Sequence, residues 1–274
     1  MDIDILGTLA VREKGVSITP TAPKPRQVLA LLALGADQVV HVDTLSEELW
    51  GAKPPRSARP TLQTYILQLR ELITVALESG DAEESRSAKD VLLTVPGGYL
   101  LKSGGGTSDV REFERLAGMG YRAMDAEDYP GAAQRLREAL ALWTGPALAD
   151  VHAGTHLETQ TKRLEESRLC ALDQRIEADL RLGRHRELLA ELTVLVSRYP
   201  THESLCGQYM LALYRSGRRG EALDAYQRLR ATLVRTLGLE PSPALGKLQR
   251  SILMAGPEGV VPPASGSGRL TAIG

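Results

Sequence analysis

The sequence predicts a mainly α-helical protein, in which a small α+β domain is followed by an all-α domain of paired helices. Three observations lead to this prediction. Three helical segments and a strand pair joined by Pro96-Gly97-Gly98 follow a short amino-terminal sheet. The chain after Gly106 is helical almost without interruption. Within it, two glycines with similar neighbours lie 34 positions apart, a spacing typical of stacked helix pairs.

Composition and charge are those of an ordinary globular chain. Its 274 residues, 43% hydrophobic and 24% charged, suffice for two domains. The start, Met1-Asp2-Ile3-Asp4, is not basic, and no run of about 18 apolar residues occurs, so we expect a cytoplasmic protein without a membrane partner. The net charge of −1 argues against coating nucleic acid through bulk positive charge. A DNA partner would need positive charge in one place.

Catalytic and metal-binding functions are not indicated. Cys170 and Cys206 lie in separate helical stretches without a C-x-x-C pair, so we expect both thiols to pack in a helical core. Four histidines lie beside arginines and glutamates without the spacing that a metal needs, at His152, His156, His185 and His202. We therefore expect no enzyme, no cofactor and no metal.

The first segments predict a small sheet and two helices. Residues 2–11 should form one strand, because apolar side chains recur with period two, and residues 15–18 should continue it across a turn. Residues 23–35 predict a buried scaffold helix, since proline suits its first turn and glycine its end. Residues 42–51 predict a short second helix, which Asp43 can cap.

Residues 57–73 are the most informative segment. They predict a third helix that Ser57 can cap, with an inward apolar stripe formed by Leu62, Ile66, Leu69 and Ile73. Side chains outside this stripe suit base edges and phosphates, namely Thr61, Gln63, Thr64, Leu67, Gln68 and Arg70. An outward Leu67 gains nothing in water, whereas in a major groove it could meet a thymine methyl. Taken alone, the segment fits an ordinary amphipathic helix equally well.

Its neighbourhood favours DNA binding. Residues 91–102 predict a hairpin, and the order helix, helix, hairpin is that of a winged helix-turn-helix. Residues 51–70 contain no acidic side chain, and their cations are Lys53, Arg56, Arg59 and Arg70. Lys24 and Arg26 lie in a similar acid-free stretch. Residues 79–90, between the third helix and the hairpin, are polar and predict an exposed loop.

The second half predicts helix pairs behind a flexible joint at residues 104–108. A phosphate-binding loop is excluded there, because no Gly-Lys-Ser/Thr ending follows. Residues 109–116 and 132–143 predict a helical hairpin.

Gly183 and Gly217 are the two glycines of the repeat, whose period is that of tetratricopeptide repeats. Each glycine should close one helix, and Leu189 or Leu223 should point inward from the next. The stack could receive a partner protein, or only rigidify or dimerise the molecule. The tail after Gly256 is expected to be disordered.

Together these motifs resemble the Streptomyces antibiotic regulatory protein family over most of the chain. In the first domain the resemblance rests on residues 25–32, 45–50, 62–70 and 95–99. In the second it rests on residues 139–150, 175–185, 210–218 and 237–241. It implies an OmpR/PhoB-type winged helix-turn-helix over 1–105, a bacterial transcriptional activator domain with tetratricopeptide-like repeats over 106–256, and a disordered tail over 257–274.

The same resemblance implies which residues face DNA. The recognition-helix pattern matches at Thr61, Gln63, Thr64, Tyr65, Leu67, Gln68 and Arg70. Arg26 would meet a phosphate, and a wing near Gly98 and Lys102 would approach the minor groove; we add Lys24, Arg56 and Arg59 as cations beside the duplex. Relatives often carry arginines where this chain has Gln68 and Glu71, so base preferences do not transfer.

The function implied is a nucleoid-associated activator of a secondary-metabolite (antibiotic) gene cluster. It would bind direct repeats near the −35 promoter region as a homodimer or as side-by-side protomers, and would recruit sigma factor and RNA polymerase. Two alternatives stay open at this point. One is a repressor, and the other is a helical-repeat scaffold whose winged helix has lost DNA binding.

Overall fold

The computed structural model describes residues 1–79 and 86–254. Met1–Arg175 and Ile176–Gly274 form two compact units. The tail predicted to be disordered, 257–274, lies outside the described residues, and so does the middle of the loop expected at 79–90. The end of that loop is a short helix, α4 (Ala88–Val91), which the polar composition did not predict.

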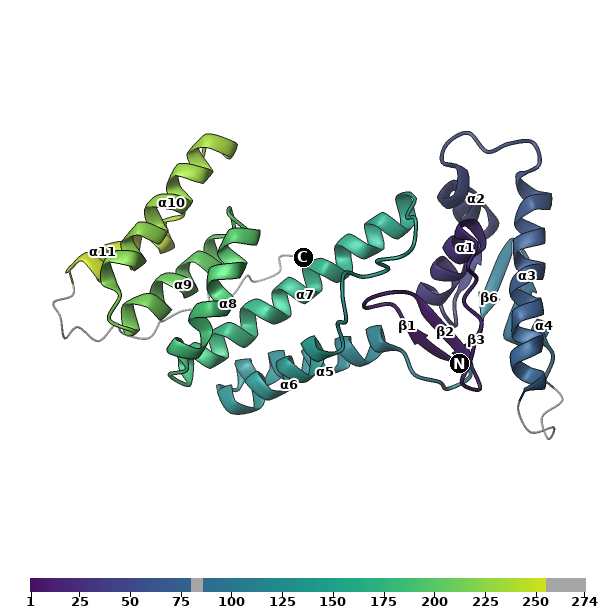
Figure 1. Cartoon of the computed structure of the whole chain (residues 1–274), viewed down its shortest axis with the longest axis horizontal. Coiled ribbons are helices and arrows are strands. Elements are labelled where there is room, and N and C mark those ends of the chain that lie inside the picture. Colours follow the sequence, from purple (N-terminus) through teal and green to yellow (C-terminus); the bar gives the residue numbers. More distant parts are fainter. Residues whose placement is uncertain (80–85, 255–274) are drawn as a thin grey trace, which may run out of the picture. The chain divides into compact units, whose positions relative to one another are not determined.

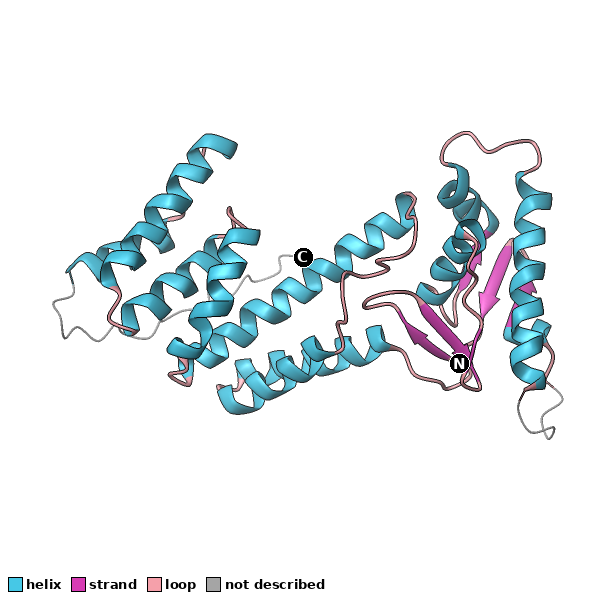
Figure 2. Ribbon diagram, viewed as in Figure 1, coloured by secondary structure: helices cyan, strands magenta, loops and turns pink. Residues whose placement is uncertain are grey.

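The first unit begins with two small antiparallel sheets and their helices (Figures 1 and 2). One sheet has the order β1-β2-β3, with strands β1 (Asp2–Asp4), β2 (Ala10–Glu13) and β3 (Val16–Ser17). The other has the order β4-β6-β5, with strands β4 (Val39–His41), β5 (Leu92–Val95) and β6 (Gly98–Leu101). The helices before the hairpin are α1 (Pro23–Leu34), α2 (Val42–Trp50) and α3 (Ala58–Glu78). This is the predicted order of helices and hairpin.

The core of this part confirms the stripe predicted on α3. All four stripe residues are buried, namely Leu62, Ile66, Leu69 and Ile73. α1 is buried along most of its length, as expected of a scaffold helix, and α3 packs against α1 and α2. The apolar stripe therefore fixes which face of α3 turns outward.

Two helix caps differ from the prediction. α2 begins after His41, so Asp43 lies within the first turn rather than at the cap. Ser57 does precede α3, but its side chain makes no capping hydrogen bond. Its backbone, with φ −87° and ψ 8°, lacks the extended conformation that usually aims a capping side chain at the first turn.

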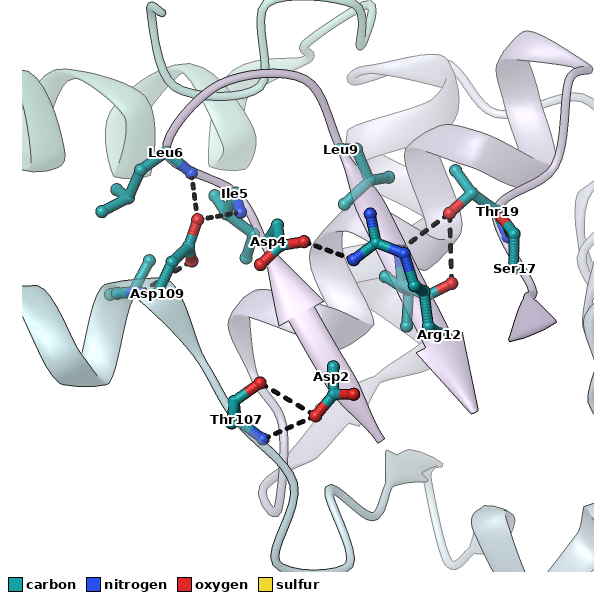
Figure 3. Close-up of polar contacts among 12 residues, drawn as sticks. Asp2, Asp4, Ile5, Leu6, Leu9, Arg12, Ser17, Thr19, Thr107 and Asp109 are labelled. Atoms are coloured by element: carbon teal, nitrogen blue, oxygen red, sulfur yellow. Dashed lines mark hydrogen bonds and ion pairs between the residues drawn. The ribbon is translucent and has the colours of Figure 1, made fainter. Parts of the chain in front are cut away.

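The single strand predicted over residues 2–11 is wrong. The chain leaves the sheet after β1, because the N–H groups of Ile5 and Leu6 donate to the Asp109 carboxylate at 2.6 and 2.7 Å (Figure 3). Burial raises the pKa of the Asp109 carboxyl, although these backbone donors act in the opposite direction. Close by, Thr107 donates from its N–H and hydroxyl to Asp2 (Figure 3). These contacts join the first sheet to the start of the helix that begins at Asp109.

Three helices complete the first unit: α5 (Asp109–Asp125), α6 (Tyr129–Ala141) and the start of α7 (Thr155–Arg181). α5 and α6 pack together as the predicted hairpin. The segment after α6 is bonded to the loop between β1 and β2, with Thr144 N–H donating to Leu6 O at 2.9 Å and Leu148 N–H to Ile5 O at 3.0 Å. The first compact unit thus holds α5 and α6 together with the winged helix-turn-helix part.

The glycine joint, which we expected to be flexible, is held at Ser103 and at Gly106, while Gly104 and Gly105 between them are exposed. Ser103 donates from its N–H and hydroxyl to Asp37 at 2.9 and 2.7 Å, which anchors the chain just before the glycines. Gly106 then crosses the backbone of Met1 so tightly that a Cβ would have no room. The absence of a side chain at Gly106 thus permits the close approach of this segment to the amino terminus.

The second unit contains the end of α7 and four further helices. They are α8 (His185–Arg198), α9 (Glu203–Arg215), α10 (Arg219–Leu237) and α11 (Pro243–Met254). α9 packs against both α8 and α10, as expected of stacked helix pairs. Gly183 and Gly217 have φ values of +76° and +81° between consecutive helices, which confirms that each closes a helix.

The inward positions of the repeat lie one residue earlier than predicted. Leu188 and Ala222 are buried, while Leu189 and Leu223 are half-buried. The two buried positions are also 34 residues apart, so the predicted period holds and only the inward position within each repeat differs. α8 and α10 begin at His185 and Arg219, and their first buried residue comes one turn later.

Candidate nucleic-acid interface

The exposed face of α3 carries most of the residues predicted to face DNA. Gln63, Thr64, Leu67 and Gln68 are all exposed, and their spacing places them side by side on one face of the helix. Leu67 is 57% exposed, which confirms that it points outward. Thr61 and Tyr65 are half-buried at the margins of this face. We call the exposed side chains of Gln63, Thr64, Leu67 and Gln68 the α3 face.

Charge divides α3 into two halves. Lys53, Arg56 and Arg59 are exposed at its amino end, and among the described residues none of these side chains has an ion-pair partner. The carboxyl half carries the exposed acids Glu71 and Glu78. The positive end of the helix dipole adds to the three cations, so the amino half attracts an anion and the carboxyl half repels one.

Two predicted cations are bonded within the protein. The Lys24 ammonium donates to the Leu49 carbonyl oxygen at 2.6 Å, at the carboxyl end of α2, where a cation is favourable. The Arg26 guanidinium pairs with the Asp150 carboxylate and donates to the carbonyl oxygen of Pro20 at 3.1 Å. A phosphate contact by Arg26 stays a prediction, and the phosphate would compete with Asp150.

Arg70 is bonded to the hairpin that follows α3. Its Nε and Nη2 donate to the Leu92 carbonyl oxygen at 3.1 and 2.8 Å, and Nη2 also donates to Thr94 Oγ1 at 2.8 Å. Both acceptors belong to β5. The structure therefore places Arg70 between α3 and this strand, apart from the α3 face.

The hairpin of β5 and β6, which we call the wing, has its tip at Pro96 and Gly97. Both residues are exposed, and Gly97 has φ +79°, which suits glycine in a tight turn. Gly98 is buried, because it passes against the carbonyl oxygen of Val40 in β4. Lys102 is exposed just beyond β6. Of the two wing residues predicted near DNA, only Lys102 presents a side chain to solvent.

Sequence reasoning missed two features of this surface. β4 escaped notice because three residues between helices are too few to show a period. Thr94 was not singled out, although alternation in β5 leaves it exposed between the less exposed Leu93 and Val95.

The remaining candidates for chemistry lie elsewhere. Cys206 is buried, and burial raises the pKa of its thiol to about 12. Cys170 is exposed on α7, so the prediction of two core thiols is wrong for Cys170. Within residues 1–79 and 86–254, no cluster of His, Cys, Asp and Glu could hold a metal ion. No helix in those ranges combines the length and apolar character needed to cross a bilayer.

Two family descriptions match the chain. Residues 16–98 match "Transcriptional regulatory protein, C terminal", and residues 108–253 match "Bacterial transcriptional activator domain". The first covers β3 to the start of β6, and the second covers α5 to nearly the end of α11.

Similar proteins share both parts. The regulatory protein DnrI of Streptomyces peucetius is 54% identical over 257 residues, which cover 94% of this chain and 93% of DnrI. The regulatory protein AfsR of Streptomyces coelicolor is 37% identical over 254 residues, 92% of this chain but 24% of AfsR. A solved structure of Mycobacterium tuberculosis EmbR in complex with a low-affinity phosphopeptide has a TM-score of 0.82 and 33% identity, covering 92% of this chain and 64% of that one.

Proposed function

This chain is a transcriptional regulator of the Streptomyces antibiotic regulatory protein family, with an OmpR-like winged helix followed by a bacterial transcriptional activator domain, and we propose that it activates transcription by docking α3 in the major groove of promoter DNA. The limits proposed for the two domains are 1–105 and 106–256. The relatives named DnrI and AfsR are regulatory proteins, in keeping with this proposal.

The observation that carries the proposal is the α3 face. It combines two amides, a hydroxyl and an exposed leucine on the helix half that lacks acids. Gln63 and Gln68 can each exchange two hydrogen bonds with an adenine edge, and Leu67 can contact a thymine methyl. The cations Arg56 and Arg59 would meet phosphates. Major-groove readout therefore needs no rearrangement of this helix.

Two groups of side chains should affect binding differently. Gln68→Ala removes a base contact, so we expect a loss of about 1–3 kcal/mol on the cognate site alone. Arg56→Gln removes a phosphate contact, so it should weaken all sequences alike and reduce the salt slope by about 1. Gln227→Ala is the matched control, because Gln227 is an exposed glutamine on α10, in the second unit.

The measurement is a titration of the full chain against cognate and scrambled duplexes at several salt concentrations. Equal losses on both duplexes for Gln68→Ala and Arg56→Gln would contradict this division of roles. Arg26→Ala is less informative than Arg56→Gln, since it also releases Asp150 from its ion pair. A loss of binding in Arg26→Ala would thus mix a phosphate effect with a structural one.

We further propose the promoter arrangement and the partners. Head-to-tail repeats beside the −35 region would place successive copies of α3 about one DNA turn apart on one face of the duplex. Protomers bound side by side, or as a homodimer, would then present the activator domain to sigma factor and RNA polymerase. The regulated genes would be those of a secondary-metabolite or antibiotic pathway, in line with the family.

In vitro transcription tests the direction of regulation. Purified protein should raise transcription from a promoter that it protects in footprinting, with RNA polymerase and sigma factor as the only other proteins. Lower transcription from the protected promoter would indicate a repressor. A complete lack of protection at low salt would indicate a scaffold that does not bind DNA.

A further inference from the structure

Arg70 connects α3, which the proposed function places in the major groove, to the wing, which the family resemblance places near the minor groove. It lies on α3, and its guanidinium is bonded to β5 in the wing. The sheet order β4-β6-β5 makes β5 an edge strand, so one of its sides has no strand partner within the described residues. The arginine donates to that side.

The geometry of the contact suits arginine in particular. Nε and Nη2 both donate to the Leu92 carbonyl oxygen, and Nη2 also reaches Thr94 Oγ1 at 2.8 Å. A guanidinium offers these donors in a rigid planar fork, whereas a lysine ammonium is a single point on a flexible stem. Thr94 is exposed and lies two residues before Pro96 at the tip of the wing.

We propose that Arg70 is a positioning residue, which holds the wing at a fixed spacing from α3 so that the two elements reach the major groove and the adjacent minor groove together. This inference rests on the proposed function. Arg70 acts through Leu92 and Thr94, not by touching a base or a phosphate. Without it, α3 still docks, but the wing no longer meets the minor groove in register.

Charge-conserving and charge-removing substitutions separate this role from a phosphate contact. Arg70→Lys keeps the charge but loses the fork, and Arg70→Met loses both. We expect both variants to bind the cognate duplex roughly tenfold more weakly than the wild type, because each loses the hydrogen bonds to β5. The salt dependence of binding should be the same in the two variants, since the charge of Arg70 itself meets no phosphate.

Hydroxyl-radical footprinting of the full chain gives the readout that a general loss of stability would not produce. Protection at the α3 half-site should persist in Arg70→Lys, while protection of the adjoining minor-groove sugars by the wing disappears. Thr94→Val removes one acceptor and keeps a β-branched residue in the strand, so it should give the same change in the footprint with a smaller loss of affinity. Its unfolding midpoint should match that of the wild type.

Two results would overturn the inference. One is wild-type affinity in Arg70→Lys together with a smaller salt slope in Arg70→Met, which would make Arg70 a phosphate contact. The other is an unchanged wing footprint in both variants. Either result would leave the proposed function intact, because that function fails only if the wild-type chain itself protects no DNA.

Discussion

Glu48 offers a direct test of how the winged helix is joined to the helices that follow it. Glu48 is 3% exposed on α2, and its carboxylate accepts hydrogen bonds from the N–H groups of Gly154, His156 and Leu157 at 2.5, 2.9 and 3.1 Å. These donors lie at the amino end of α7, where N–H groups have no partner within the helix. The side chain of Gln27 donates to the same carboxylate at 2.9 Å. Glu48→Gln should therefore destabilise the first unit.

The magnitude follows from the contacts. Glutamine keeps one acceptor oxygen and turns the other into an NH₂ group, which faces N–H donors in a buried site. An anion at a partly buried helix amino end contributes up to ~2 kcal/mol, and a buried donor left unsatisfied costs about 1–3 kcal/mol. The free energy of unfolding should thus fall by roughly 2–4 kcal/mol.

Glu47→Gln is the matched control for this experiment. The Glu47 side chain is 55% exposed and pairs with the His156 ring at 3.0 Å. Its loss should change the free energy of unfolding by about 0.5 kcal/mol or less, because exposed ion pairs contribute little.

The assay combines urea unfolding with amide hydrogen exchange. Because the chain has two compact units, exchange at residues 154–157 is needed to show that the loss is local to this junction. Faster exchange there in Glu48→Gln, with wild-type exchange in Glu47→Gln, is the expected result. Equal unfolding midpoints and equal exchange in the two variants would refute the reasoning.

Three further predictions concern other parts of the fold. Gly98→Ala would push a Cβ against the Val40 carbonyl oxygen, so thermal unfolding should show a loss of about 1–3 kcal/mol or more; an unchanged midpoint would mean that β4 can move away. Hydrogen bonds from Ser103 lower the pKa of Asp37 from 3.8 to about 2, so this carboxylate stabilises the fold above pH 3.8 and the contribution disappears as the pH falls towards 2. Asp37→Asn should accordingly destabilise the chain at neutral pH but not at pH 2, and a pH-independent difference in unfolding would contradict this. Leu192→Ala empties a fully buried position in α8, so the second unit should lose about 2–5 kcal/mol while hydrogen exchange in the first unit stays the same.

Local patterns were enough to predict the elements that carry the α3 face. The stripe that includes Leu62 and Ile66 set the buried side of α3, so Leu67 and Gln68 followed as outward residues. The glycine spacing likewise predicted the helix pairs of the second unit, because closing a helix in the left-handed region is a local property of Gly183 and Gly217.

Contacts between distant parts of the chain could not be predicted in this way. Arg26 and Lys24 look like free cations in the sequence, yet Arg26 pairs with Asp150, more than a hundred residues away, and Lys24 reaches the end of α2. The break after β1 has the same origin, since the acceptor of the Ile5 N–H is Asp109. Such partners depend on tertiary packing, which a periodic pattern does not encode.

Methylation protection by dimethyl sulfate tests the central claim most directly, because the reagent attacks guanine N7 in the major groove and adenine N3 in the minor groove. The wild-type chain should protect guanine N7 in each half-site where α3 docks. Gln68→Ala should need a higher protein concentration for the same protection, because it binds the cognate site more weakly, while Gln227→Ala should need the wild-type concentration. Protected adenine N3 without any protected guanine N7, at a protein concentration that saturates a guanine-containing site, would contradict the docking of α3 in the major groove.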